Sequence, residues 1–284
     1  MEILYNNDSV TVMLILTAAI LLGGGIACIV KRKSKVEKII SFICFPFFAI
    51  IVTLLVFLLL NRESKSKSDI PMVFVEGGTF TMGCTSEQGD DCWDNEKPAH
   101  QVSLSSFYIG QYEVTQMQWK AVMDNNPSYF KSDDLPVERV SWDDVQEFIQ
   151  KLNTKTNKQY RLPTESEWEF AARGGNRSNS YKYSGSNTVD KAAWYNENSG
   201  DTTHPVGSKL PNELGIYDMS GNVYEWCSEG FSCYPRGLSN DSSRMFRGGS
   251  WQNVARGTRV SFRDYCTPDY ECSCLGFRLA CNSK

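Results

Sequence analysis

Histidine is scarce in this sequence of 284 residues, which contains only His100 and His204. Two imidazoles are too few for a metal site built from a cluster of His ligands, and they disfavour acid–base schemes based on histidine. The chain also lacks an excess of positive charge, because 29 Lys and Arg residues stand against 33 Asp and Glu residues. No overall positive field would attract a phosphate backbone, and we therefore expect no nucleic-acid partner.

Charged residues are absent from two long apolar segments, residues 10–30 and 39–60. At about 1.5 Å per residue, each segment is long enough to cross roughly 30 Å of hydrocarbon, which predicts two transmembrane helices. A cleaved signal peptide is the alternative for the first segment. Residues 1–8, however, carry two acidic residues and no Lys or Arg, the opposite of a positive leader region. The sequence therefore favours a chain that stays in a membrane, with the bilayer as a partner.

The charge of the connecting loop predicts the orientation of these helices. Residues 31–38 hold five Lys and Arg residues, whereas residues 1–9 hold none. The positive-inside rule places this loop in the cytoplasm and residues 1–9 outside it. A polar linker over residues 61–70 then leads to an extracytoplasmic domain at residues 71–284. We expect the location to be a bacterial inner membrane.

Cysteine usage agrees with an extracytoplasmic domain. Eight of the ten cysteines follow the second apolar segment, and an even number suits a compartment in which disulfides persist. The short spacings of Cys84 with Cys92 and of Cys227 with Cys233 suggest two local bridges. The spacing leaves the remaining connectivity open.

Three segments of this domain predict helices. Ser141 begins a capping box, and the residues after it carry one apolar stripe at positions i, i+3, i+4 and i+7. The stripe consists of Val145, Phe148, Ile149 and Leu152. Thr164 and Glu167 form a second capping box, and residues 115–123 are a third helical candidate.

Strand-like segments are short, with residues 72–75 and 101–109 as the clearest examples. Gly, Asn, Ser and Pro are scattered between them. The sequence therefore predicts an α+β domain of low regular content. We expect its core, its disulfides and bound ions to stabilise it.

Six segments of the domain, in order along the chain, resemble one family. They are residues 77–83 (GGTFTMG), 112–115 (YEVT), 161–169 (RLPTESEWE), 215–226 (GIYDMSGNVYEW), 247–251 (RGGSW) and 275–278 (LGFR). Together they are similar to the formylglycine-generating enzyme (sulfatase-modifying factor) family, over about residues 72–280. The resemblance implies a variant of the C-type-lectin fold. It does not by itself imply the family's enzymatic activity, because one fold carries many functions.

The resemblance also identifies the positions that carry catalysis in this family. In active members, two cysteines stand three and eight positions after the Ser that corresponds to Ser250, and they bind copper(I) through soft sulfur ligands. Asn253 and Thr258 occupy these positions here, and neither can supply a thiolate. A copper site is therefore not expected, unless Cys272 and Cys274 form a relocated one. The alternative is that these two cysteines are disulfides or free thiols.

Calcium is the cofactor that the resemblance favours. The family binds calcium along the segment that matches residues 215–226, and the matching ligands here are Asp218, Gly221, Val223 and Glu225. Alternatively, Asp218 and Glu225 simply cap turns. A second family calcium site would lie near Asn198 and Gly200.

The segment between Trp251 and Leu275 alternates small, polar and aromatic residues, and it resembles the variable region of retroelement-diversified proteins with this fold. The predicted ligand-binding surface consists of Gln252, Asn253, Thr258, Phe262, Asp264, Tyr265, Asp269 and Tyr270. The sequence thus favours a membrane-anchored, non-catalytic domain that binds an extracytoplasmic ligand or protein. The alternatives are an active oxidase that converts a sulfatase cysteine to formylglycine, and a structural subunit that contacts only partner proteins.

Overall fold

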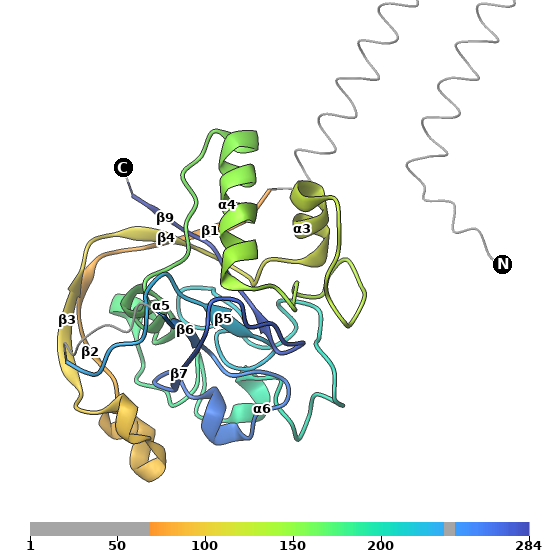
Figure 1. The fold of residues 1–284 in the computed structure, drawn as a ribbon. Helices are drawn as coiled ribbons and strands as arrows, with labels where there is room; N and C mark the ends of the chain where they lie inside the picture. Colours follow the sequence, from red (N-terminus) through yellow and green to blue (C-terminus); the bar gives the residue numbers. More distant parts are fainter. Residues whose placement is uncertain (1–68, 236–241, 284) are drawn as a thin grey trace, which may run out of the picture. The chain divides into compact units, whose positions relative to one another are not determined.

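The computed structural model describes residues 69–235 and 242–283 (Figure 1). Contacts within the chain divide it into two units, Met1–Ser66 and Lys67–Lys284, and the described residues belong to the second. The predicted transmembrane helices at 10–30 and 39–60, with their loop, lie outside the described residues. Within residues 69–235 and 242–283, no helix is both long enough and apolar enough to span a bilayer.

Short strands form three small sheets in the domain. The first sheet has the order β1-β4-β9, the second pairs β2 with β3, and the third has the order β7-β6-β5-β8. All pairs are antiparallel except β5 with β8. The strands are β1 (Met72–Val75), β2 (Gly78–Met82), β3 (His100–Leu104), β4 (Phe107–Gly110), β5 (Tyr224–Trp226), β6 (Arg244–Arg247), β7 (Arg263–Cys266), β8 (Leu275–Gly276) and β9 (Ala280–Asn282).

The predicted strand at 72–75 is confirmed, whereas the single strand predicted over 101–109 is wrong. The chain forms β3 and β4 instead, because residues 100–104 pair with β2 in one sheet and residues 107–110 pair with β1 in another. Leu104 pairs with Gly78 of β2, whereas Phe107 pairs with Val75 of β1. At the crossing, a Cβ on Gly77 would lie 2.5 Å from the Leu104 carbonyl oxygen, so the close approach requires glycine there.

The three predicted helices are confirmed, and each begins with a capping box. At the start of α5, the Thr164 hydroxyl accepts a hydrogen bond from the Glu167 N–H (3.1 Å), and the Glu167 carboxylate accepts one from the Thr164 N–H (2.9 Å). The helices are α3 (Gln116–Met123), α4 (Trp142–Thr156), α5 (Glu165–Ala172) and α6 (Val189–Ala192). Four 3₁₀ segments are η1 (Ser86–Asp91), η2 (Asp94–Glu96), η3 (Gly175–Arg177) and η4 (Ala255–Thr258).

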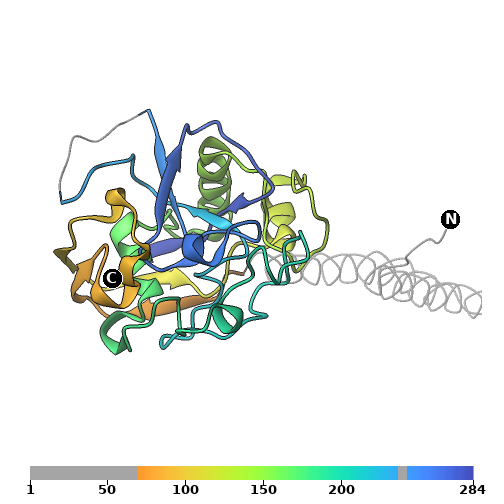
Figure 2. The ribbon, with the colours of Figure 1, turned by 90° about the horizontal axis from the view of Figure 1, so that it is seen from below.

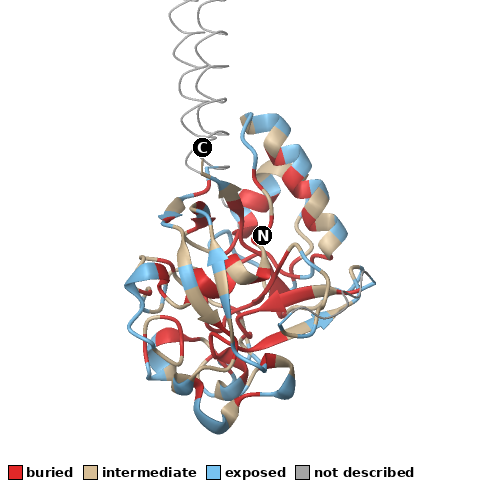
Figure 3. Ribbon diagram, turned by 90° about the vertical axis from the view of Figure 1, so that its left-hand side faces the viewer, coloured by how far each residue is buried: buried red, intermediate tan, exposed pale blue. Residues whose placement is uncertain are grey.

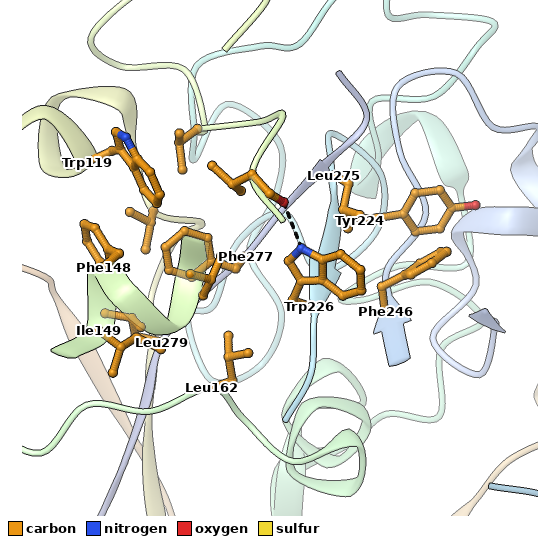
Figure 4. Close-up of a cluster of buried hydrophobic side chains, with 14 of the residues drawn as sticks. Trp119, Phe148, Ile149, Leu162, Tyr224, Trp226, Phe246, Leu275, Phe277 and Leu279 are labelled. Carbon is orange, nitrogen blue, oxygen red and sulfur yellow. Dashed lines mark hydrogen bonds between the residues drawn. The ribbon is translucent and has the colours of Figure 1, made fainter. Parts of the chain in front are cut away.

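Helices α3 and α4 lie side by side and contribute aromatic side chains to one part of the core (Figures 1, 2 and 4). The rings of Trp119 and Phe148 stack with centroids 5.1 Å apart, and Phe277 meets Phe148 edge to face at 5.4 Å. Trp226 lies in the same cluster, where its indole N–H donates to the Val140 carbonyl (3.0 Å). Buried residues gather at the centre of the domain, and exposed residues lie at its surface, on loops and on the outer sides of helices and strands (Figure 3).

Two disulfides are present among the described cysteines. The bridge predicted between Cys84 and Cys92 is confirmed. The bridge suggested between Cys227 and Cys233 is wrong, because the Cys227 thiol lies in the core directly after β5 while Cys233 is exposed. Their close spacing in sequence does not bring the two sulfurs together.

The second disulfide joins Cys272 to Cys274. A bridged pair of sulfurs offers no thiolate, so these two residues supply no copper ligands while the disulfide persists. The alternative interpretation of these cysteines as a disulfide is confirmed.

Candidate functional site

A cavity of about 440 Å³ opens where four segments distant in the sequence meet. The segments are the η2 region, the start of β5, the chain around η4, and the start of β7. The lining residues are Trp93, Asn95, Tyr224, Asn253, Val254, Gly257, Phe262, Arg263 and Asp264. The cavity thus contains one of the two copper positions implied by the family resemblance, together with part of the predicted ligand-binding surface.

Asn253, at the first copper position, is held by hydrogen bonds through both ends of its amide. Its Oδ1 accepts from the backbone N–H of Ser250 (2.9 Å) and from the Ser250 hydroxyl (2.6 Å). Its Nδ2 donates to the Tyr224 hydroxyl oxygen (2.7 Å). The side chain therefore fixes the turn after β6 and orients the Tyr224 ring at the cavity wall.

Thr258, at the second copper position, does not reach the cavity. Its side chain is fully buried, and its hydroxyl donates to the Ala255 carbonyl within η4 (3.0 Å). The prediction that Thr258 belongs to a ligand-binding surface is therefore wrong, because the tight η4 turn directs this residue into the protein.

Aromatic rings form one wall of the cavity. Trp93 is 41% exposed, and its ring meets Phe262 edge to face at 5.9 Å. The Tyr224 ring lies 6.3 Å from Phe262, and burial raises the pKa of Tyr224, so its hydroxyl is neutral at physiological pH. Phe262 itself is buried, so it lines the cavity but is not an exposed surface residue.

Asn95 and Asp264 contribute hydrogen-bond acceptors to the lining of the cavity. Asn95 donates from Nδ2 to the Arg263 carbonyl (3.2 Å), while its Oδ1 is buried and accepts no hydrogen bond from a described residue. Asp264 accepts the Tyr265 N–H at Oδ1 (2.9 Å), and burial raises the pKa of its carboxyl.

A buried ion pair holds the η2 segment in place behind the cavity. The Arg259 guanidinium donates to both carboxylate oxygens of Glu96, at 2.7 and 2.9 Å, and both side chains are fully buried. Burial alone would raise the pKa of Glu96, but hydrogen bonds from Arg259, Ser261 and the Trp93 N–H outweigh it and hold this pKa below its usual value. Glu96 therefore positions Trp93 by a direct contact with its backbone.

The other predicted surface residues lie mostly where a ligand could contact them. Gln252, Tyr265, Asp269 and Tyr270 are exposed, and Asn253 and Asp264 are half-buried. These exposed residues are close in sequence to residues that line the cavity, but they do not line it themselves. The Tyr265 ring instead packs against Phe231 at 4.1 Å.

The predicted calcium ligands Asp218 and Glu225 lie in a buried acidic cluster with Glu113. Both carboxylate oxygens of Glu225 accept hydrogen bonds from the Arg278 guanidinium, each at 2.6 Å. Asp218 accepts the Gly207 N–H at Oδ2 (2.6 Å), but its Oδ1 is buried and has no partner among the described residues.

The three buried carboxyl groups of this cluster are accompanied by one guanidinium, that of Arg278. Burial raises the pKa of Asp218 to about 6, with a further contribution from the nearby Glu225 carboxylate. Burial, Asp218 and Glu225 together raise the pKa of Glu113 well above its usual value. The unpartnered Oδ1 of Asp218 fits a cation ligand, whereas the Glu225 oxygens are already bonded to Arg278.

Two further predicted ligands, Gly221 and Val223, would contribute main-chain carbonyls. A Cβ on Gly221 would lie 2.2 Å from the Trp194 carbonyl oxygen, and φ is +80° there, so this position requires glycine. In residues 69–235 and 242–283, no three His, Cys, Asp or Glu side chains surround one metal position. A calcium ion here would therefore depend on main-chain carbonyls as well as on carboxylates.

At the predicted second calcium site, Asn198 closes its own turn. Its Oδ1 accepts the Tyr195 N–H (2.9 Å), and its Nδ2 donates to the Ala193 carbonyl (3.0 Å). Gly200 adopts a φ of +62° just beyond this turn. Calcium binding at this position stays a prediction.

Sequence reasoning missed the contribution of the η2 segment to the site. Trp93, Asn95 and Glu96 lie outside all six family-like motifs, in a polar stretch without periodicity. The only local signal was the short spacing of Cys84 and Cys92, which indicates an ordered loop. Nothing local connects that loop with residues more than 150 positions later in the chain.

The mixed helix and strand architecture belongs to a class of domain that is already known from solved structures. The chain is similar to the structure of Treponema denticola variable protein 1, with a TM-score of 0.68 and 34% sequence identity. The match covers 75% of this chain and 95% of that chain. The domain therefore shares its mixed helix and strand fold with this solved structure.

The chain belongs to the family described as the sulfatase-modifying factor enzyme 1-like domain, whose model matches residues 59–283. It is 37% identical over 241 residues to chaperone protein LppX of Paenibacillus barcinonensis, covering 67% of this chain and 82% of that relative. It is 27% identical over 293 residues to the formylglycine-generating enzyme of Streptomyces coelicolor, covering 76% and 91% respectively. It also matches serine/threonine-protein kinase pkn1 of Chlamydia caviae at 31% identity over 249 residues. That match covers 74% of this chain but only 37% of the length of pkn1. Membership confirms the family resemblance seen in the sequence.

Proposed function

We propose that this domain is a non-catalytic binding module and that the cavity beside Asn253 is its binding site. The observation that carries the proposal is the state of the family's copper positions. Asn253 is hydrogen-bonded to Ser250 and Tyr224, and Thr258 is buried in η4. An open cavity remains there without a thiolate pair, which suits recognition of a ligand or protein better than activation of oxygen.

The proposal includes two features that rest on the sequence. The apolar segments 10–30 and 39–60 would anchor the domain at the outer face of a bacterial inner membrane. The exposed residues around the cavity, such as Gln252, Tyr265 and Tyr270, would form a diversified surface, in keeping with the similarity to a protein called variable protein 1. A nearby copy of the coding segment for residues 251–275 and a reverse transcriptase gene would support diversification, and the absence of both would contradict it.

The catalytic alternative is tested with copper(I). We expect the full-length chain, purified in mild detergent, to bind no stoichiometric copper(I) and to show no copper-dependent oxygen uptake with a cysteine-containing peptide. A formylglycine-generating enzyme measured under the same conditions is the positive control. Turnover by this chain above the rate of copper and peptide alone would contradict the proposal and support an active oxidase.

We further propose that calcium stabilises the domain through Asp218 and the carbonyls of Gly221 and Val223. The support is the buried Asp218 Oδ1, which has no partner among the described residues, within a cluster of three buried carboxylates and one arginine. The ion would neutralise charge and join the 215–226 segment to its surroundings. We assign this calcium ion a structural role and no catalytic one.

Calcium at about 100 times its Kd is expected to stabilise the domain by about 2.7 kcal/mol. For a domain of this size, that corresponds to a rise in Tm of roughly 5–10 °C. Asp218→Asn should abolish the rise, and Asp269→Asn, at an exposed residue, should preserve it. Thermal unfolding with calcium or with a chelator measures the effect, and an equal rise in the Asp218→Asn variant would contradict this assignment.

A further inference from the structure

Another cavity, of about 620 Å³, lies beside strand β3, which stands at one side of the domain (Figure 1). Its walls are residues 100–103 of β3, the first two residues of α5, and the chain between Glu229 and Pro235. It shares no lining residue with the cavity beside Asn253. Its volume is within the range of about 300–1,000 Å³ that is typical of ligand sites.

Strand β3 has a hydrogen-bonded partner on one side only. It pairs with β2, and the second sheet contains no other described strand. No backbone hydrogen bond joins residues 100–104 to any other described segment. In an antiparallel pair, alternate residues direct their N–H and C=O groups away from the partner strand. The outer edge of β3 therefore carries main-chain donors and acceptors that have no partner among the described residues.

This free edge borders the cavity. Successive side chains of a strand point to opposite faces of its sheet, and four successive residues of β3 line the cavity, so the cavity lies at the edge of the strand. Exposed edges are usually protected by lysine, proline or other charged residues, but His100–Leu104 has the sequence HQVSL and contains none of these. An edge of this kind can pair with an added strand.

Glu229, on the opposite wall, carries a carboxylate without a basic partner. Its Oε2 accepts the Glu165 N–H (2.6 Å), and no described Lys or Arg side chain forms an ion pair with it. Arg161 donates instead to both oxygens of Glu167 (2.6 and 2.7 Å). Arg263 donates to both oxygens of Glu165 (2.6 and 2.7 Å). Desolvation and these two carboxylates raise the pKa of Glu229 to about 7, and the residue is exposed to a cation from outside.

We propose that β3 accepts an extended peptide segment of a partner protein as an added strand, and that a lysine or arginine side chain of this segment pairs with Glu229. The main chain of the segment would bond to the free edge of His100–Leu104, and alternate side chains would enter the cavity. Main-chain pairing gives affinity for any extended segment, so the charge at Glu229 supplies the selectivity. This site is additional to the one proposed beside Asn253.

Blocked heptapeptides test the proposal on the full-length chain in mild detergent at pH 8, where the Glu229 carboxyl, with a pKa of about 7, is mostly ionised. In the first peptide, threonine alternates with valine, lysine and valine, so the lysine shares one face of the strand with two apolar side chains. Norleucine or glutamate replaces the lysine in two comparison peptides. We expect calorimetry to show at least tenfold tighter binding of the lysine peptide than of the norleucine peptide, with the glutamate peptide weakest.

Two N-methylated versions of the lysine peptide test the added strand. Successive backbone N–H groups face opposite edges of a strand, so each version is methylated on one of the two alternating sets. Methylation of the set that faces β3 should weaken binding at least tenfold, and methylation of the other set should change it less than about threefold. Binding of the unmodified peptide should slow amide hydrogen exchange several-fold in β3 and leave β1, an edge strand of another sheet, unchanged.

One cavity variant and a matched control locate the charge interaction. Glu229→Gln keeps an acceptor for the Glu165 N–H but removes the charge. It should weaken the lysine peptide about tenfold and leave the norleucine peptide unchanged. Glu271→Gln removes the same charge from an exposed residue outside the cavity, and it should leave all affinities unchanged.

Equal loss of affinity in both N-methylated versions, or no loss in either, would overturn the added strand. Equal binding of the lysine and norleucine peptides, or unchanged binding by Glu229→Gln, would overturn the role of the cation. Absence of binding by every peptide would overturn both. Because the two cavities share no lining residue, copper-dependent turnover would contradict the function proposed beside Asn253 and leave the β3 site standing.

Discussion

Arg278→Met is expected to lower the free energy of unfolding by about 3–5 kcal/mol, because it removes the positive partner of a buried carboxylate. Arg278 is fully buried and donates twice to Glu225, at 2.6 Å each. It also donates to the Gly110 and Tyr217 carbonyls, both at 2.9 Å. A single side chain thus joins the end of β4, the 215–226 segment and β5.

The large effect is expected because Glu225 has acidic neighbours. The Asp218 and Glu225 carboxylates raise the pKa of Glu113, the Glu225 carboxylate also raises that of Asp218, and Arg278 opposes both shifts. Without the guanidinium, the cluster must take up protons or admit water, and either change weakens the core. Methionine has a similar length, so the substitution removes charge and hydrogen bonds without leaving a large void.

Urea unfolding of the full-length chain in the presence of a calcium chelator measures this effect. Arg177→Met is the matched control, because Arg177 is exposed, and its free energy of unfolding should change by less than about 0.5 kcal/mol. A loss below about 1 kcal/mol in Arg278→Met would mean that the cluster is neutralised by protons and does not depend on the arginine.

Arg259→Met is expected to destabilise the domain by a similar amount, about 3–5 kcal/mol, and also to impair the cavity. Arg259 and Glu96 are separated by 163 residues and are both fully buried. Glu96 in turn accepts the Trp93 N–H (2.9 Å), so loss of Arg259 should release the segment that carries Trp93 and Asn95. Urea unfolding of the full-length chain measures the loss of stability, and a loss below about 1 kcal/mol would contradict the prediction.

A double-mutant cycle separates the ion pair from the loss of packing. Glu96→Leu removes the other charge, and the double variant Glu96→Leu, Arg259→Met should be more stable than the sum of the single changes predicts, by at least about 2 kcal/mol. Additive single effects would show that the two charges are not coupled. The copper positions are intact in all three variants, so binding and stability are measured without a change at Asn253 or Thr258.

The family motifs and helix starts could be predicted because their signals are local. A hydroxyl at Thr164 and a carboxylate three residues later define the start of α5 whatever surrounds them. The apolar stripe that follows Ser141 likewise defines the buried face of α4, where all four of its residues are buried. Strand 72–75 was predictable for the same reason, as a short apolar run between Pro71 and Glu76.

The errors arose where a partner lies far away in the sequence. The strand predicted over 101–109 divides because its two halves pair with different sheets. Cys227 and Cys233 stay unpaired because the core covers one of them. Thr258 is buried because η4 turns it inward, which its polar character did not indicate.

By itself, the sequence determined the family, the α+β class, the starts of the three main helices and the loss of cysteine from both copper positions. Each of these follows from residue identities or from spacings of a few residues. Only the tertiary structure decided that the η2 segment forms a wall of the cavity, that Asn253 is bonded to Tyr224, and that Asp264 lacks a basic partner among the described residues. These facts depend on segments that meet through long-range packing, and the buried Glu96–Arg259 pair is the clearest physical cause of that meeting.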